Sequence, residues 1–341
     1  MRISKLSLLL LLSVALWGTL GAAAPSTPLR LVSDVWPPFT DVQDKPHEAI
    51  DLVKAALLRG KVQSQSKIMT WTDAIAQLQQ RKLDGSSAMW KSPEREKYLL
   101  FSKPYLENRL VLVARKGERV SAASVAELAG KRLALTKGYA YGAAVAQMPQ
   151  VTIVYRNSDE DCLRAVLAKE ADYLLLDELL VQHLFQFYTA KANELIVAGD
   201  KAIVHYPLHF AIRRDYPGAQ EIIANFDRNM AQMRVDGAYN EILHVDWIRA
   251  DVNGDGVLDY VASSKHAPPK AANTDPYLAH TGYPVFTPES TPPPGMGRTP
   301  TYQIDGRTYN TWGDAATTLQ GGGAQARGAY KYSAGAVLFG F

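Results

Sequence analysis

The sequence predicts an α/β fold, because short apolar strands alternate with amphipathic helices along most of the chain. Between residues 132 and 177 the order is strand, loop, strand, helix and strand, at the spacing typical of a largely parallel sheet. A returning strand at 208–213 and helices at 217–234 and 238–243 follow. The length allows two domains, or one two-lobed domain with a tail.

The amino-terminal part begins with a strand over Leu29–Val32 and the loop Asp34–Phe39. Two prolines fix the backbone of this loop and leave Trp36 and Phe39 as rigid aromatic projections. Apolar residues at helical spacing follow at 50–57. After a strand-like piece near 67–69, Thr70 begins a capping-box pattern that opens a second helix.

The stretch from Asp84 to Tyr105 carries the clearest candidate site. Ser92 is typical of a helix N-cap, and Pro93 suits the first helical position. The helix start therefore presents free amides beside the guanidinium of Arg95. Both groups favour negative charge, so we expect this end to suit a carboxylate. The alternative for Arg95 is an exposed helical arginine paired with a neighbouring glutamate.

The amino terminus has the pattern of a secretory signal peptide over residues 1–23: basic residues, an apolar core and small residues before the expected cleavage. We therefore expect a soluble protein exported to the periplasm. The single cysteine, Cys162, excludes an internal disulfide and is expected to be a buried thiol. A net charge of +3 is too small to indicate binding to nucleic acid.

The composition changes after Ser264. Nine of the 19 prolines lie between residues 265 and 303, which predicts an extended connector. We expect residues 265–341 to form a Pro/Gly-rich, largely irregular tail, with a hairpin near 302–309. The sequence assigns this tail no function.

The segment 251–264 contains a possible calcium loop. Oxygen ligands at alternate positions and a glycine at the sixth position are typical of such loops. The expected metal residues are Asp251, Asn253, Asp255, Val257 and Asp259. Since Ala262 stands where an EF-hand has glutamate, the pattern resembles the shorter calcium loops of integrin-type repeats. One structural Ca²⁺ would then clamp the junction with the tail; the alternative is a metal-free turn.

A series of motifs recurs in order along the chain. They are Trp36-Pro37-Pro38-Phe39, Ile50-Asp51-Leu52, Trp71, Ser92-Pro93-Glu94-Arg95, Phe101-Ser102-Lys103-Pro104-Tyr105, Glu127-Leu128-Ala129-Gly130-Lys131, Lys137-Gly138, Ala171-Asp172, Leu176-Asp177, and Asp236-Gly237 before Trp247. With these motifs the chain resembles the family 3 bacterial extracellular solute-binding proteins, the periplasmic receptors of polar amino-acid ABC transporters.

The resemblance implies a type II periplasmic binding protein, with two α/β lobes, a hinge and a ligand cleft between the lobes. Lobe 1 would comprise residues 28–114 and 207–250, and lobe 2 residues 115–206. The two crossover strands would lie near 114–117 and 205–208.

The resemblance also implies roles for individual residues. Arg95 would hold a ligand carboxylate and Asp177 an ammonium group, although Asp177 could instead cap the helix that follows it. Trp36 and Trp71 would pack on the ligand; either could instead be a core residue. The loop at Gly138 would lend amides from lobe 2.

Two departures from the family pattern bear on the ligand. Ala88-Met89-Trp90 stands where amino-acid binders usually carry Gly-x-Thr, and Tyr139 stands where threonine is common. Both changes weaken a plain amino-acid interpretation and allow an aromatic ligand between rings.

The resemblance implies a monomeric receptor that captures a small zwitterion, an amino acid or a relative, for the permease of an ABC transporter in the inner membrane. One alternative is a dehydratase-like enzyme on the same fold, which would need an acid or base in the cleft; Glu178 or Lys137 could serve there only by speculation. The other is a sensor or scaffold that acts through the tail.

Overall fold

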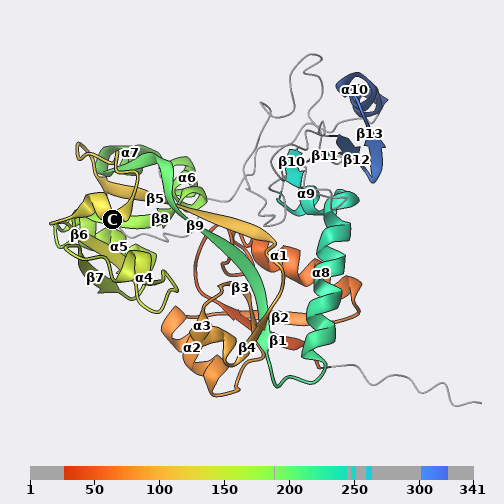
Figure 1. Ribbon diagram of the computed structural model, residues 1–341, viewed down its shortest axis with the longest axis horizontal. Coiled ribbons are helices and arrows are strands. Elements are labelled where there is room, and N and C mark those ends of the chain that lie inside the picture. Colours follow the sequence, from red (N-terminus) through yellow and green to blue (C-terminus); the bar gives the residue numbers. More distant parts are fainter. Residues whose placement is uncertain (1–26, 188, 244–246, 251–258, 263–300, 322–341) are drawn as a thin grey trace, which may run out of the picture.

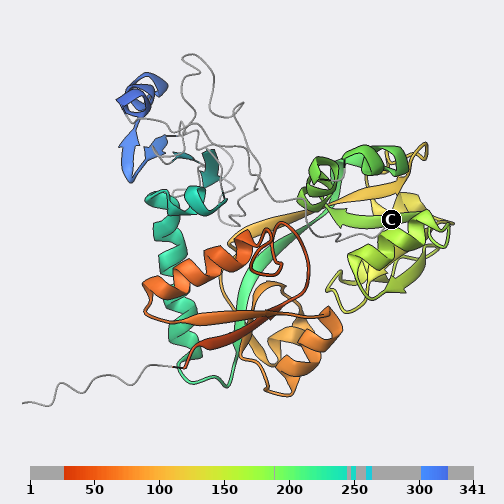
Figure 2. The same ribbon diagram turned by 180° about the vertical axis from the view of Figure 1, so that it is seen from behind.

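The computed structural model describes residues 27–187, 189–243, 247–250, 259–262 and 301–321 (Figure 1). The predicted signal peptide, residues 251–258 of the predicted calcium loop and most of the predicted tail lie outside these ranges. The described part has two α/β lobes and a small carboxyl-terminal module (Figures 1 and 2). Among the helices of these ranges, none has the length and apolarity that spanning a bilayer requires.

Lobe 1 is built on the strand order β2-β1-β3-β9, with β4 pairing to β9. β1 runs parallel to β2 and β3, whereas β9 is antiparallel to β3 and β4. Its elements before the crossing are β1 (Leu29–Ser33), α1 (Glu48–Arg59), β2 (Ser64–Ile68), α2 (Trp71–Gln79), β3 (Gly85–Trp90), α3 (Pro93–Glu96) and β4 (Leu99–Phe101). β9 (Ile196–Arg213), α8 (Ala219–Val235) and α9 (Ala238–Leu243) complete it. Asn229 of α8 donates to the Ala56 carbonyl of α1 at 2.8 Å, which fixes the two helices side by side.

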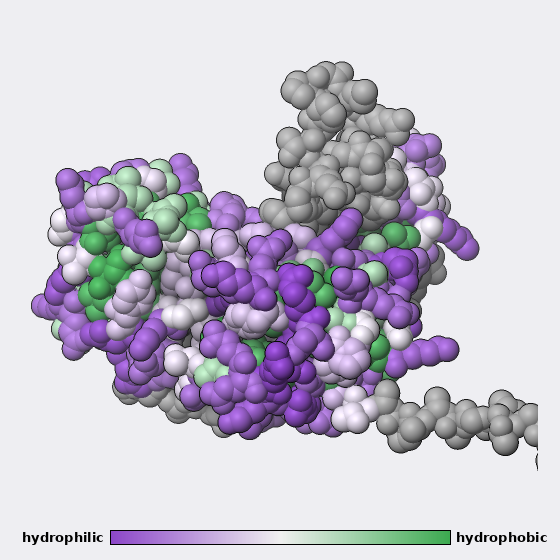
Figure 3. All heavy atoms as spheres, turned by 60° about the horizontal axis from the view of Figure 1, so that its bottom comes forward, coloured by the Kyte–Doolittle hydropathy of each residue, from purple (hydrophilic) through white to green (hydrophobic). Residues whose placement is uncertain are grey.

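Lobe 2 is built on the strand order β5-β8-β6-β7. β6 is parallel to β7 and β8, and β5 is antiparallel to β8. Its elements are β5 (Leu106–Arg115), the 3-10 turn η1 (Val125–Leu128), β6 (Arg132–Thr136), α4 (Ala143–Ala146), β7 (Thr152–Arg156), α5 (Asp159–Leu167), β8 (Tyr173–Asp177), α6 (Glu178–Phe187) and α7 (Thr189–Leu195). Apolar colour gathers at the lobe 2 end in Figure 3, while hydrophilic residues cover most of the visible face of lobe 1.

Strands β5 and β9 join the two lobes into one continuous sheet. Leu106 to Leu110 pairs with the 204–208 part of β9, and residues 110–114 of β5 already pair with β8. β5 and β9 stay paired from Leu106 with Leu208 to Arg115 with Ile196, so this pair of strands forms the connection between the lobes. The pairing has register irregularities between Leu110 and Val113. The predicted crossovers near 114–117 and 205–208 stay predictions.

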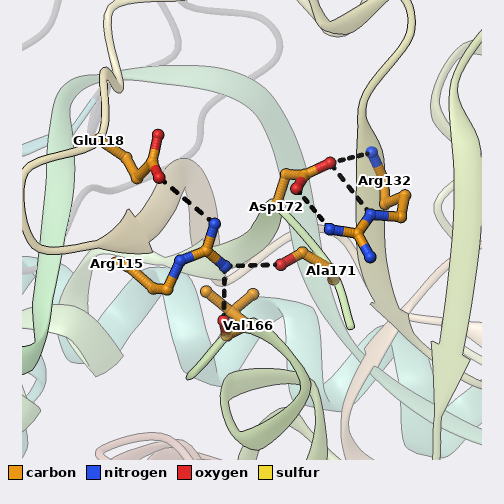
Figure 4. Close-up of polar contacts among 6 residues, drawn as sticks. All are labelled: Arg115, Glu118, Arg132, Val166, Ala171 and Asp172. Atoms are coloured by element: carbon orange, nitrogen blue, oxygen red, sulfur yellow. Dashed lines mark hydrogen bonds and ion pairs between the residues drawn. The ribbon is translucent and has the colours of Figure 1, made fainter. Parts of the chain in front are cut away.

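Each lobe contains the same arginine–aspartate clamp at the start of its sheet. In lobe 2, the backbone amide, Nε and Nη2 of Arg132 all donate to the Asp172 carboxylate, at 2.9, 3.3 and 2.7 Å (Figure 4). In lobe 1, the corresponding groups of Arg30 donate to Asp84 at 2.9, 3.0 and 2.8 Å. Although burial acts to raise the pKa of Asp84, the bonds from Arg30 hold it below its ordinary value. The clamps fix the turn before β3 and before β8 in the same way.

Arg115 anchors the same turn of lobe 2 from the other side. Its Nη1 donates to the carbonyls of Val166 and Ala171 at 2.7 and 2.9 Å, and its Nη2 lies 3.4 Å from Glu118 (Figure 4). The Ala171-Asp172 motif is thus the place where the end of α5, the start of β8 and the strands β5 and β6 are tied together.

The carboxyl-terminal module is a four-stranded sheet in the order β10-β11-β12-β13 with one helix. Its elements are β10 (Trp247–Ala250), β11 (Asp259–Ala262), β12 (Tyr302–Ile304), β13 (Arg307–Tyr309) and α10 (Trp312–Gly321). The predicted hairpin near 302–309 is confirmed. Residues 301–321 are nevertheless an exception to the irregular tail that the composition predicts, because they pair with β11 and pack a small apolar cluster. Asn240 of α9 donates to the Val261 carbonyl at 3.0 Å and so ties the module to lobe 1.

The predicted helix starts are confirmed. The Ser92 side chain caps α3 and Pro93 occupies its first turn. The Thr70 side chain caps α2 by accepting from the Asp73 amide. These local signals place Arg95 and Trp71 at two neighbouring helix starts of lobe 1.

Candidate functional site

The two lobes meet around a small cavity of about 20 Å³. Three elements of lobe 1 supply most of its walls: the loop after β1, the start of α2 and the run from β3 into α3. Lobe 2 supplies the loop after β6. The lining residues are Asp34, Trp36, Trp71, Ala88, Met89, Trp90, Arg95 and Tyr139. Six of the eight residues predicted to bind ligand therefore line one cavity; Gly138 lies beside it and Asp177 does not line it.

Arg95 is the buried cation of the site, with 5% of its surface exposed. Its Nη1 donates to the Trp90 carbonyl at 2.5 Å, and its Nη2 donates to the Gly138 carbonyl at 2.8 Å. The guanidinium carbon lies 5.1 Å from the centre of the Trp71 ring, in cation–π range. Burial lowers the pKa of Arg95 to about 10. The side chain is still charged at neutral pH, and neutral carbonyls and a ring surround it.

Gly138 of lobe 2 forms hydrogen bonds with both Arg95 and Trp71 of lobe 1. Its carbonyl accepts from Arg95 and also from the Trp71 indole at 2.9 Å. The residue has φ +84°, in the left-handed region, and a Cβ here would lie 3.3 Å from the Trp71 ring. A side chain here would therefore strain the backbone and crowd the Trp71 ring, which favours glycine at this position. The family resemblance implies amides from this loop, whereas the structure presents a carbonyl.

Tyr139 reaches from lobe 2 across the cavity to lobe 1. Its hydroxyl donates to Asp34 Oδ2 at 2.8 Å. Burial raises the pKa of Asp34 to about 6, against the opposing effects of the Tyr139 hydrogen bond and the charge of Arg95. The cavity thus contains one carboxylate and one guanidinium, and each is bonded to a neutral group of the same loop.

Aromatic rings make the remaining walls. The Trp90 ring lies 5.3 Å from Tyr139 and 5.7 Å from Trp36, both edge-on, and stacks on Tyr206 of β9 at 4.4 Å. The Trp90 indole nitrogen donates at 2.7 Å to Asn108, which is not among the lining residues of the cavity. Trp90, which replaces the threonine common in the family, is therefore an apolar wall and supplies no hydrogen bond to the cavity.

Asp177 lies at the end of β8, and the structure gives its carboxylate other partners. It accepts from the Asn108 side chain and from the Arg109 amide, both at 3.1 Å, and from the Leu179 amide at 2.8 Å. Burial raises its pKa to about 7 in spite of these bonds. The amide contact two residues on matches the capping alternative that the sequence allows. Asp177 supports Asn108, and through it Trp90, from behind.

Asp34 and Met89 are lining residues that the sequence did not single out. The signal for Asp34 was present, since it directly follows β1, at the carboxyl edge where ligands of open α/β sheets bind. The prediction for this loop instead named Trp36, whose position the neighbouring prolines fix.

For the predicted metal site, the structure describes Asp259 alone; Asp251, Asn253, Asp255 and Val257 lie outside the described residues. Asp259 is buried, and its Oδ1 accepts from the amide and hydroxyl of Thr301, both at 2.8 Å. Its Oδ2 has no hydrogen-bond partner among the described residues. The described residues contain no group of three or more His, Cys, Asp or Glu side chains that could hold a metal ion.

Two α/β lobes joined by two strands, with charged and aromatic groups at their shared cleft, define a ligand-binding protein of the periplasmic-binding type. Residues 30–249 match the model of the bacterial extracellular solute-binding proteins, family 3. The chain belongs to this family.

Relatives of two kinds share this sequence pattern. The virulence sensor protein BvgS of Bordetella bronchiseptica is 29% identical over 201 residues, which are 58% of this chain and 15% of the sensor. The chain thus spans a small part of that relative's length. The ABC transporter arginine-binding protein 1 of Escherichia coli is 27% identical over 236 residues, 66% of this chain and 92% of that protein.

Solved structures share the fold. An ancestral arginine-binding protein bound to glutamine has a TM-score of 0.55 at 23% identity, over 64% of this chain and 96% of that one. A histidine kinase sensor domain with similarity to periplasmic binding proteins has a TM-score of 0.53 at 19% identity, over 64% of this chain and 94% of that one. An ancestral amino-acid-binding protein, a precursor of cyclohexadienyl dehydratase, has a TM-score of 0.52 at 24% identity, over 63% of this chain and 93% of that one.

The raised pKa of Asp34 predicts a pH effect on stability. The unfolded chain releases this proton near pH 4 and the folded chain near pH 6, so between these values the folded chain holds more protons. The contribution of Asp34 is therefore full below pH 4 and is lost as the pH rises to 6. Relative to Asp34→Asn, the wild type should lose about 1 kcal/mol of unfolding free energy between pH 4 and pH 7, allowing for the partial exposure of Asp34.

Urea unfolding of both chains at several pH values measures this difference. Asp44→Asn, which changes an exposed carboxyl of the same loop, is the control and should follow the wild type. Parallel curves for the wild type and Asp34→Asn would show that Asp34 is not held in a desolvated place.

Proposed function

We propose that the protein is a receptor for a small zwitterion, an amino acid or a relative of one. The observation that carries this is that Arg95 and Asp34 line the same aromatic cavity between the lobes. Arg95 would hold the carboxylate, because a guanidinium can form a bidentate ion pair with a carboxylate. The neutral carbonyls that now accept from Arg95 cannot supply such a pair. Asp34 would hold the ammonium group, the role that the family pattern suggested for Asp177.

The aromatic walls favour a ligand with an apolar, aromatic or cationic side chain. Trp36, Trp71 and Trp90 all line the cavity. Rings next to a carboxylate favour cations as well as aromatic groups. The arginine-binding relative supports an amino-acid ligand of this kind, without fixing which one.

Delivery of the ligand to an ABC permease, with export of the mature monomer to the periplasm, is part of the same proposal. The family and the relative from Escherichia coli, matched over 92% of its length, support it. The similarity to a virulence sensor makes a sensory role the second candidate. A dehydratase-like enzyme has less support, because Glu178 pairs with Arg109 at 3.2 Å and neither Glu178 nor Lys137 is among the lining residues of the cavity.

Thermal unfolding with a panel of amino acids, amines and aromatic acids tests the receptor proposal. A ligand at a hundredfold excess over its dissociation constant adds about 2.7 kcal/mol to stability. Arg95→Met should abolish the response to any zwitterion that stabilises the wild type, since the carboxylate loses its only buried cation in the cavity.

Arg164→Met is the matched control, because Arg164 pairs with Glu160 on the surface of α5. It should keep the full response. The proposal fails if no zwitterion of the panel stabilises the wild type, or if Arg95→Met responds as the wild type does.

We also propose one structural Ca²⁺ in the loop 251–259. The spare oxygen of buried Asp259 supports it, because a buried carboxylate oxygen without a partner is costly unless an ion or a donor meets it. Calcium should raise the melting temperature and a chelator should lower it by several degrees. Asp255→Asn should remove both effects, while Asp305→Asn, outside the loop, should keep them. A melting temperature that neither calcium nor chelator changes would contradict the site.

A further inference from the structure

The loop 137–142 of lobe 2 is shaped to project into the cleft. It connects β6 to α4 and contains two glycines with left-handed backbone, Gly138 at φ +84° and Gly142 at φ +69°. Between them, the Tyr139 amide donates to the Thr136 carbonyl at 3.3 Å, which closes a tight turn at the end of β6. The turn directs the Gly138 carbonyl and the Tyr139 side chain together toward lobe 1.

These two groups have the hydrogen-bonding polarity of a zwitterion. The Gly138 carbonyl presents an acceptor to Arg95 and Trp71, at 2.8 and 2.9 Å, where a ligand carboxylate would lie. The Tyr139 hydroxyl presents a donor to Asp34 at 2.8 Å, where a ligand ammonium group would lie. Two consecutive residues of one loop thus form hydrogen bonds with both Arg95 and Asp34.

The Tyr139 ring also occupies the space of a ligand side chain. Its centroid lies 5.9 Å from Trp36, 5.9 Å from Trp71 and 5.3 Å from Trp90. The space that remains, about 20 Å³, holds about one water molecule. An amino acid does not fit beside Tyr139 in this arrangement, so the loop and a ligand compete for one place.

The loop is a weaker partner for the anchors than a zwitterion would be. Among the described residues Arg95 forms no ion pair, and its guanidinium donates to two neutral carbonyls. Asp34 likewise receives a neutral hydroxyl. A ligand carboxylate and ammonium group would add the attraction between opposite charges, and a bidentate pair with the guanidinium, to the hydrogen bonds that the loop already makes, so a ligand with both charges can displace the loop.

We infer that Gly138 and Tyr139 act as a built-in surrogate ligand: the cleft closes on its own loop without ligand, and a ligand enters by displacing Tyr139. Closure of the cleft on Tyr139 does not depend on the proposed function, whereas displacement of Tyr139 by a zwitterion rests on it. Ligand binding would then exchange one closed or partly closed state for another, and the usual change from an open to a closed form would be small.

The distance between the lobes in the ligand-free chain tests the closure. Fluorescent labels can be placed on cysteines introduced at the exposed residues Gln80 of lobe 1 and Gln147 of lobe 2. Cys162 is buried and burial raises its thiol pKa to about 12, so it should remain unlabelled in the folded protein. Protein refolded from denaturant excludes a carried-over ligand. The wild type should show mostly the short distance, and Tyr139→Ala mostly a long one.

Two further variants separate the role of Tyr139 from general loss of structure. Tyr139→Phe keeps the ring and loses the bond to Asp34, so its distances should lie between those of the wild type and Tyr139→Ala. Tyr155→Ala removes a tyrosine that is 48% exposed on β7 of the same lobe, and should behave as the wild type. Added p-cresol supplies the missing ring and hydroxyl, so it should restore the short distance in Tyr139→Ala alone.

Affinity gives the second readout. If the loop leaves the site free for about a tenth of the time, its removal tightens the apparent affinity for a responsive zwitterion about tenfold. A ligand-free wild type that shows the long distance, or a Tyr139→Ala chain with unchanged distances, overturns the inference even if zwitterions bind. If the distances change as expected and no zwitterion binds Tyr139→Ala, the proposed function fails and the surrogate remains.

Discussion

The burial of the Arg95 guanidinium is the constraint on which the cleft depends. A buried cation must keep hydrogen-bond acceptors, and Arg95 has one from its own lobe, the Trp90 carbonyl, and one from lobe 2, the Gly138 carbonyl. Separating the lobes would remove the second acceptor. The same carbonyl also accepts a hydrogen bond from the Trp71 indole. One backbone carbonyl of lobe 2 therefore satisfies two side-chain donors of lobe 1.

The frame around this contact is rigid within each lobe. The two arginine–aspartate clamps, Arg30 with Asp84 and Arg132 with Asp172, fix corresponding turns with the same three donors. β5 and β9 are the strands that pair across the lobes. A movement that opens the cleft is therefore expected at these two strands, as in hinge closure of other two-lobed proteins.

Local signals in the sequence predicted what local chemistry determines. Ser92, Pro93 and Thr70 identified two helix starts because capping depends on a few neighbouring residues. The position of Asp34 after β1 was a local signal for a site residue, but its contact with Tyr139, 105 residues away across the cleft, could not be predicted from local sequence. For Asp177 the sequence left two roles open, and only the packing of Asn108 and two backbone amides against it shows which contacts it makes.

A double-mutant cycle on Asp34 and Tyr139 in the ligand-free chain tests the central claim most directly. Unfolding free energies of the wild type, Asp34→Ala, Tyr139→Phe and the double variant give the coupling of carboxylate and hydroxyl. A cleft closed on Tyr139 predicts a coupling of about 1.5–3 kcal/mol, as for a hydrogen bond to a charged group. A coupling within about 0.3 kcal/mol of zero would contradict the account, because the two groups would then be apart in solution.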